Sequence, residues 1–105
     1  MNLDTLIDHY EKNDEYNLPI LNYKEWLKPF GEFISKINKN YDNFNYKKIG
    51  KILLVVEVTG MTTEEKEDYE SYYEILRVFI NLLDKHKNKK PKEIYQIALK
   101  EKMRY

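Results

Sequence analysis

The sequence predicts an all-α protein: a small single-domain bundle of four to five helices, built around one long amphipathic helix over about residues 62–87. Three observations support this class. The long segment repeats its apolar residues at helical spacing. A chain of 105 residues with 42% hydrophobic content can bury one core, so residues 1–105 are expected to form one helical domain. Only one segment favours a strand by composition, and a lone strand would lack a partner for its backbone groups.

The long helix is the best-defined element. Its apolar residues recur three and four positions apart, which places them on one helical face: Tyr69, Tyr72, Leu76, Phe79, Leu83 and His86. Thr62 is expected to cap the helix, with Glu65 completing a capping box. Acidic residues occupy its first turns, and Lys85 and Lys87 lie near its end. The helix macrodipole favours this order of charges.

The N-terminal part predicts a short helix followed by a linker. Apolar residues at helical spacing predict the helix over roughly residues 3–13: Leu3, Leu6, Ile7 and Tyr10. Polar residues and Pro19 follow it. Because the residue before a proline is biased away from helix, residues 14–21 are expected to be a linker.

A second helical region begins after Asn22, which is expected to act as an N-cap with Glu25 at the capping-box position. Pro29 divides this region, and two interpretations compete. Either residues 23–28 form a single turn and Pro29 opens a new helix, or one helix is kinked at Pro29. We favour the first. The apolar face that follows is helical in both: Phe30, Phe33, Ile34 and Ile37.

Residues 46–59 fit both helix and strand. Four β-branched residues favour a strand: Val55, Val56, Val58 and Thr59. Four apolar residues fit helical spacing: Ile49, Ile52, Leu53 and Val56. Because no other stretch reads as a strand, we predict a helix here. Gly60 would then turn left-handed after it, and the long helix would follow as its antiparallel neighbour.

The last helix is expected to begin at Pro91, because a proline costs little at the first helical position. Glu93 lies in its first turn. Its apolar face is formed by Ile94, Ile97 and Ala98.

The sequence offers no catalytic constellation, and we predict no enzyme, no cofactor and no metal. The absence of cysteine removes thiolate zinc sites and a cysteine nucleophile. His9 and His86 are the only histidines, and neither stands in a metal-binding spacing. No apolar run approaches the ~20 residues of a membrane span, and the N-terminus does not resemble a signal peptide. We therefore expect a cytoplasmic protein with no membrane partner.

Charge segregation predicts a protein-binding surface. Residues 57–74 carry seven acidic residues against the single base Lys66, although the whole chain is neutral. Complementary charge speeds encounter and selects partners, and tyrosine is enriched at binding hot spots. The predicted acidic site, which would meet a basic surface on another protein, comprises Glu64, Glu65, Glu67, Asp68, Tyr69, Glu70, Tyr72 and Tyr73. The alternative is that these charges only complement the helix dipole and that the tyrosines line the core.

Size and composition extend this prediction by analogy alone. The Lys-, Asn-, Ile- and Tyr-rich composition is typical of an AT-rich genome. Small helical proteins of this kind are common as inhibitors, immunity proteins and anti-defence proteins of phages and mobile elements in low-GC bacteria. The wide apolar face of the long helix could also serve as the interface of a homodimer.

The alternative function is nucleic-acid binding or transcriptional regulation by a lysine cluster at residues 85–92. Its residues are Lys85, Lys87, Lys89, Lys90 and Lys92. More lysines lie between residues 24 and 51, and Tyr41 and Tyr46 beside them could stack on bases. The neutral net charge and the near absence of arginine weigh against this reading, because base edges are usually read by arginine.

Overall fold

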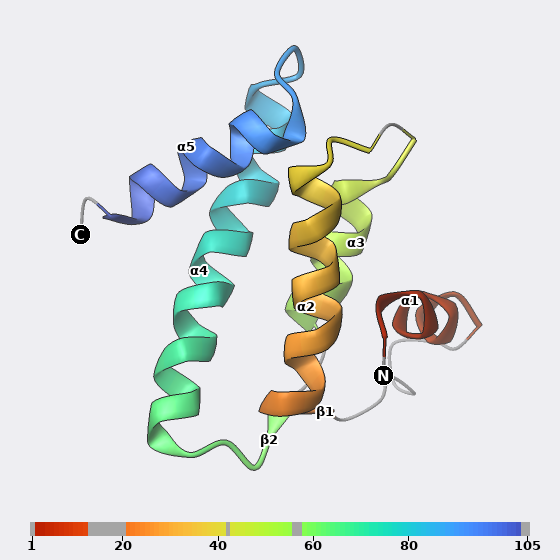
Figure 1. Ribbon diagram of the computed structural model, residues 1–105, viewed down its shortest axis with the longest axis vertical. Coiled ribbons are helices and arrows are strands. Elements are labelled where there is room, and N and C mark those ends of the chain that lie inside the picture. The colour runs from red at the N-terminus through yellow and green to blue at the C-terminus, as the bar shows by residue number, and fades with distance from the viewer. Residues whose placement is uncertain (1, 13–20, 42, 56–57, 104–105) are drawn as a thin grey trace.

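The protein is described by a computed structural model that covers residues 2–12, 21–41, 43–55 and 58–103 (Figure 1). These residues form five helices and two very short strands. In chain order the elements are α1 (Leu3–Lys12), β1 (Leu21–Asn22), α2 (Tyr23–Asn38), α3 (Tyr46–Val55), β2 (Val58–Thr59), α4 (Thr63–Lys85) and α5 (Pro91–Met103). The all-α class is confirmed.

Three helices form the body of the bundle. Figure 1 shows α2, α3 and α4 with their long axes roughly aligned, while α5 leaves the end of α4 obliquely and α1 lies on the opposite flank. α4 packs against α3 and α5, and α1 packs against α2 and α3. The start of α4 and the start of α2 lie at one end of the bundle, and the end of α4 and the start of α5 lie at the other.

The hydrophobic core draws residues from every one of these helices. Its largest fully buried side chains include Trp26 of α2, Leu53 of α3 and Phe79 of α4, with Leu3 and Ile94 from the two terminal helices. The indole N–H of Trp26 donates to the carbonyl of Leu53 at 3.4 Å. This bond gives the buried indole nitrogen a partner, which a buried polar group requires.

The prediction of the long helix is confirmed. It runs over Thr63–Lys85, two residues shorter at its end than the sequence pattern suggested. Thr62 adopts the extended conformation of an N-cap, and its hydroxyl accepts the backbone N–H of Glu65 at 3.2 Å. α5 begins at Pro91, as predicted.

The favoured interpretation of Pro29 was wrong. α2 is one continuous helix with Pro29 inside it, so no new helix starts there. The predicted capping box is present, because Asn22 accepts the Glu25 backbone N–H at 2.9 Å and Glu25 accepts the Asn22 backbone N–H. An interior proline costs a helix about 3 kcal/mol. Burial of its ring, together with the stacked rings of Trp26 and Phe30 at 4.5 Å, offsets that cost.

The interpretation of residues 46–59 as one helix was also wrong at its end. α3 stops at Val55, and β2 pairs with β1 in parallel, with Asn22 opposite Thr59. The partner strand was missed because it occupies the last residue of the predicted linker, Leu21, and the N-cap of α2. Most of that linker lies outside the described residues. Gly60 has a φ of 70°, the left-handed conformation predicted for it, although it follows a strand rather than a helix.

Candidate interaction surfaces at the two ends of the bundle

The first turns of α4 carry the acidic site predicted from the sequence. We call its five carboxylates the acidic end: Glu64, Glu65, Glu67, Asp68 and Glu70. All are exposed except Glu65, which is partly exposed. Among the described residues the ion pairs lie elsewhere, at Asp8, Glu11, Glu74 and Asp84. The acidic end therefore faces solvent without a basic partner from the described part of its own chain.

The tyrosines of the predicted site lie at the edge of the core. Tyr69 contacts Trp26 edge-on, with the ring centroids 5.0 Å apart, and Tyr72 lies 5.1 Å from Phe30. Tyr73 lies 6.2 Å from Tyr69. All three side chains are partly buried, and burial raises the pKa of the Tyr69 phenol above its usual range. The rings of Tyr69 and Tyr72 support α4 on α2, and all three tyrosines leave only part of their surface for a partner.

Tyr23 joins the acidic end, and sequence reasoning missed it. It is the first residue of α2, and its phenol lies near Tyr72, Asp68 and Glu65 of α4. Burial, and then the nearby charge of Asp68, raises the pKa of the Tyr23 phenol above its usual range. The pairing of Asn22 with Thr59 explains its position, because that pairing brings the starts of α2 and α4 together. No periodic pattern along the chain carries that information.

The opposite end of the bundle carries the predicted lysine cluster. Its five lysines are exposed, and they extend from the end of α4 through the following turn into α5: Lys85, Lys87, Lys89, Lys90 and Lys92. The backbone N–H of Lys92 donates to the side-chain oxygen of Asn40 at 3.0 Å. This bond ties the cluster to the end of α2, where Lys36 and Lys39 lie. We call these seven lysines the basic end.

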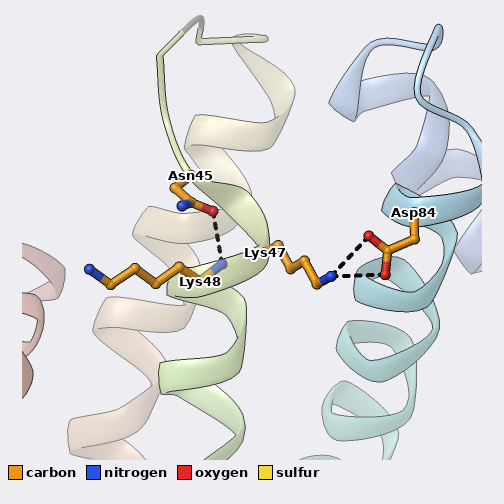
Figure 2. A network of polar contacts seen from close by, with 4 residues as sticks. All are labelled: Asn45, Lys47, Lys48 and Asp84. Atoms are coloured by element: carbon orange, nitrogen blue, oxygen red, sulfur yellow. Dashed lines mark hydrogen bonds and ion pairs between the residues drawn. The ribbon is translucent and has the colours of Figure 1, made fainter.

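An ion pair joins α3 to α4 beside the basic end (Figure 2). The Lys47 ammonium donates to both carboxylate oxygens of Asp84 at 3.0 Å. This hydrogen bond lowers the pKa of the Asp84 carboxyl, and the charges of Lys51 and Lys87 act in the same direction. The positive charge of Lys47 thus balances the Asp84 carboxylate within the chain. The acids at the start of the same helix have no such partner among the described residues.

The two tyrosines predicted to stack on bases differ in their exposure to solvent. Tyr46 is 6% exposed, and its hydroxyl donates to the carbonyls of Lys36 and Tyr41 at 2.9 and 3.1 Å. It is a core residue, so the prediction for Tyr46 was wrong. Tyr41 is 46% exposed, and the Lys36 ammonium lies 4.6 Å from the centre of its ring.

A shallow hollow of about 190 Å³ opens beside this tyrosine. It is lined by Glu32, Ser35, Lys36, Lys39 and Tyr41. One oxygen of Glu32 accepts the backbone N–H of Leu3 at 3.2 Å, which binds the start of α1 to α2. The hollow is therefore a mixed-charge surface at the side of the basic end.

Other kinds of site receive no support from the described residues. Within them, no group of three or more acidic or histidine side chains is placed to hold a metal ion. No described helix has both the length and the apolar character needed to cross a membrane. Comparison with protein-family models, with curated proteins and with solved structures finds no match to this chain.

Proposed function

We propose that this protein is a small non-catalytic docking protein whose acidic end binds a basic surface on another protein. One observation carries the proposal: five carboxylates lie on two turns of a well-anchored helix, and none is paired within the described part of the chain.

The helix dipole accounts for only part of this acidity. Its effect falls off within the first turn, so it favours Glu64 and Glu65 but not the three acids that follow. Like charges four residues apart, such as Glu64 and Asp68, disfavour a helix by about 0.2–0.5 kcal/mol per pair. The acidic end therefore carries unfavourable self-repulsion, which a basic partner would relieve.

The geometry favours docking over catalysis. Thr62 caps the start of α4, and the packing of Tyr69 and Tyr72 on Trp26 anchors its next turns, so the carboxylates are held on a fixed scaffold. Such a preorganised patch binds without the entropic cost of ordering a loop. Complementary charge then speeds encounter and selects against other acidic proteins.

The biological role that suits these features is inhibition or immunity in the cytoplasm. A short chain with a single charged docking surface resembles, in size and composition only, the inhibitors, immunity proteins and anti-defence proteins of phages and mobile elements in low-GC bacteria. The partner would be a protein with a basic surface, such as one that itself binds nucleic acid.

The test reverses charge at the acidic end. The triple variant E64K/E67K/D68K leaves Glu65 unchanged, because the Glu65 backbone N–H donates to the capping hydroxyl of Thr62. The matched control D4K/E93K/E101K reverses three exposed acids on other helices and changes net charge equally. A partner isolated from the native host with the tagged wild-type protein is then purified for binding measurements.

Surface plasmon resonance at low and physiological salt gives the decisive result. We expect the association rate of the triple variant to fall by about tenfold or more, with a weaker dependence on salt, while the control keeps its rate. Equal losses in both variants would point to net charge rather than to this surface. Unchanged binding by the triple variant would refute the proposal.

A further inference from the structure

The basic end is electrostatically separate from the acidic end. Along α4, Glu70 of the acidic end and Lys85 of the basic end are 15 residues apart, a rise of about 22 Å at 1.5 Å per residue. The Debye length at physiological salt is about 8 Å, so the two clusters do not cancel each other in solution. The neutral net charge of the chain therefore does not exclude an anionic ligand at the basic end.

Acids near the basic end reduce its charge only partly. Asp84 is paired with Lys47, and one oxygen of Glu32 is occupied by the Leu3 backbone N–H. Glu93 lies in the first turn of α5. These three acids are outnumbered by the seven lysines of the basic end, which come from the end of α2, from α4 and α5, and from the turn between α4 and α5.

An exposed aromatic ring lies within this basic surface. Among the described residues, Tyr41 is the one exposed large hydrophobic side chain. The backbone here is held from two sides, because the Tyr46 hydroxyl donates to the Tyr41 carbonyl and the neighbouring Asn40 side chain accepts the Lys92 backbone N–H. Lys36 lies against the ring, and Lys39 lines the hollow beside it. An aromatic ring among lysines is the arrangement that single-stranded nucleic acids bind, by stacking and by phosphate contact.

We infer that the basic end binds single-stranded nucleic acid, with its lysines contacting phosphates and Tyr41 stacking on a base. A single strand is favoured over a duplex because its bases expose faces for stacking. The scarcity of arginine, with Arg77 and Arg104 alone in the sequence, implies little reading of base edges and hence little sequence preference. This inference does not rest on the docking function, since it uses the other end of the molecule.

Fluorescence anisotropy with a labelled deoxythymidine oligomer of about 12 nucleotides tests the inference. We expect binding at about 50 mM salt that weakens as salt rises, with a log–log slope of roughly −0.7 for each phosphate contact. A duplex of equal length should bind more weakly. Absence of binding to the oligomer at low salt would overturn the inference.

Variants separate stacking from charge. Replacing Tyr41 with alanine should weaken oligomer binding by about 5- to 100-fold, whereas Y41F, which keeps the ring, should bind like the wild type. The pair K89E/K90E should weaken binding and make the salt slope shallower. Its matched control, K24E/K66E, makes the same change in net charge at exposed positions away from the basic end and should leave binding unchanged. Circular dichroism checks that each variant keeps its helices.

Two outcomes would assign the basic end differently. If Y41A binds as tightly as the wild type, the aromatic ring takes no part and the single-strand assignment fails. Sedimentation could instead show salt-sensitive self-association that is lost in both K89E/K90E and E64K/E67K. Without oligomer binding, that result would mean that the basic end receives the acidic end of a second copy, and the inference would be wrong.

Discussion

Gly50 shows how one residue sets the approach of α3 to α4. A Cβ atom at this position would lie 2.9 Å from Cδ1 and 3.1 Å from Cγ1 of Ile80, and 3.4 Å from the ring of Phe33. Ile80 is 5% exposed, so its side chain has little room to yield. Glycine is a weak helix former, yet at this position its missing Cβ permits a close contact between these two helices.

We predict opposite effects of the same substitution at two helical glycines. Alanine at Gly31, where a Cβ would meet nothing within 4 Å, should stabilise the protein by about 0.5–1 kcal/mol through helix propensity. Alanine at Gly50 gains the same propensity but overpacks the core, so we expect a net loss of about 1–2 kcal/mol. Urea unfolding measures both free energies.

The double variant G50A/I80V checks the cause of that loss. Valine lacks the Cδ1 atom nearest to the added methyl, so the double variant should lose less stability than the sum of the two single variants. If G50A were as stabilising as G31A, the close packing at this position would have no energetic consequence.

At the scale of elements, the two N-caps and the short parallel pairing form one structural unit. Asn22 is both the cap of α2 and the strand residue opposite Thr59, three positions before the cap of α4. Sequence alone identified both Asn22 and Thr62 as caps, because capping is a local matter of one side chain and one backbone N–H. It could not identify the strand pairing, which joins segments far apart in the chain.

We predict that the cap of α2 contributes more stability than the cap of α4. The Asn22 side chain makes two hydrogen bonds with Glu25, since its Oδ1 accepts the backbone N–H and its Nδ2 donates to the carboxylate, whereas the Thr62 side chain accepts one from Glu65. N22A should therefore cost about 1–2 kcal/mol and T62A about 0.5–1 kcal/mol, while N22S and T62S, which keep a capping oxygen, should each lose less than the corresponding alanine variant. Urea unfolding of the four variants tests the order, and a larger loss for T62A than for N22A would contradict it.

At the scale of the whole molecule, the core couples the terminal helices to the body of the bundle. Leu6 of α1 is fully buried, and Ile94 of α5 is 2% exposed, both within one hydrophobic cluster. A chain with one such core is expected to unfold as a unit. This shared core is the physical reason for predicting that residues 1–105 form a single domain.

We predict one cooperative unfolding transition that both terminal helices share. Leu6→Ala and Ile94→Ala should each destabilise that transition by about 2–5 kcal/mol, because both substitutions leave a cavity in the same core. Far-UV circular dichroism and tryptophan fluorescence, which reports the surroundings of Trp26, should give the same midpoint in each variant. Separate transitions in either variant would show that a terminal helix folds independently.

The separation of charge along the bundle also belongs to this scale. The sequence revealed the two clusters, because acids concentrate at the start of the long helix and lysines at its end. It identified further lysines and Tyr41 between residues 24 and 51, but it did not reveal that Lys36, Lys39 and Tyr41 lie beside the lysine cluster in space. That association depends on the bond from the Lys92 backbone to Asn40, residues 52 positions apart.

The sequence by itself determined the all-α class, the position of α4, the start of α5, both N-caps and the positive φ of Gly60. These features depend on local periodicity and on hydrogen bonds within a few residues, which the order of amino acids encodes directly. Only the tertiary structure decided that Pro29 lies inside α2 and that α3 ends at Val55, with β2 at Val58–Thr59. It also decided that Tyr46 is buried and Tyr41 is exposed. Each of these depends on what distant segments place around a residue, because burial and strand pairing can outweigh local preference by several kcal/mol.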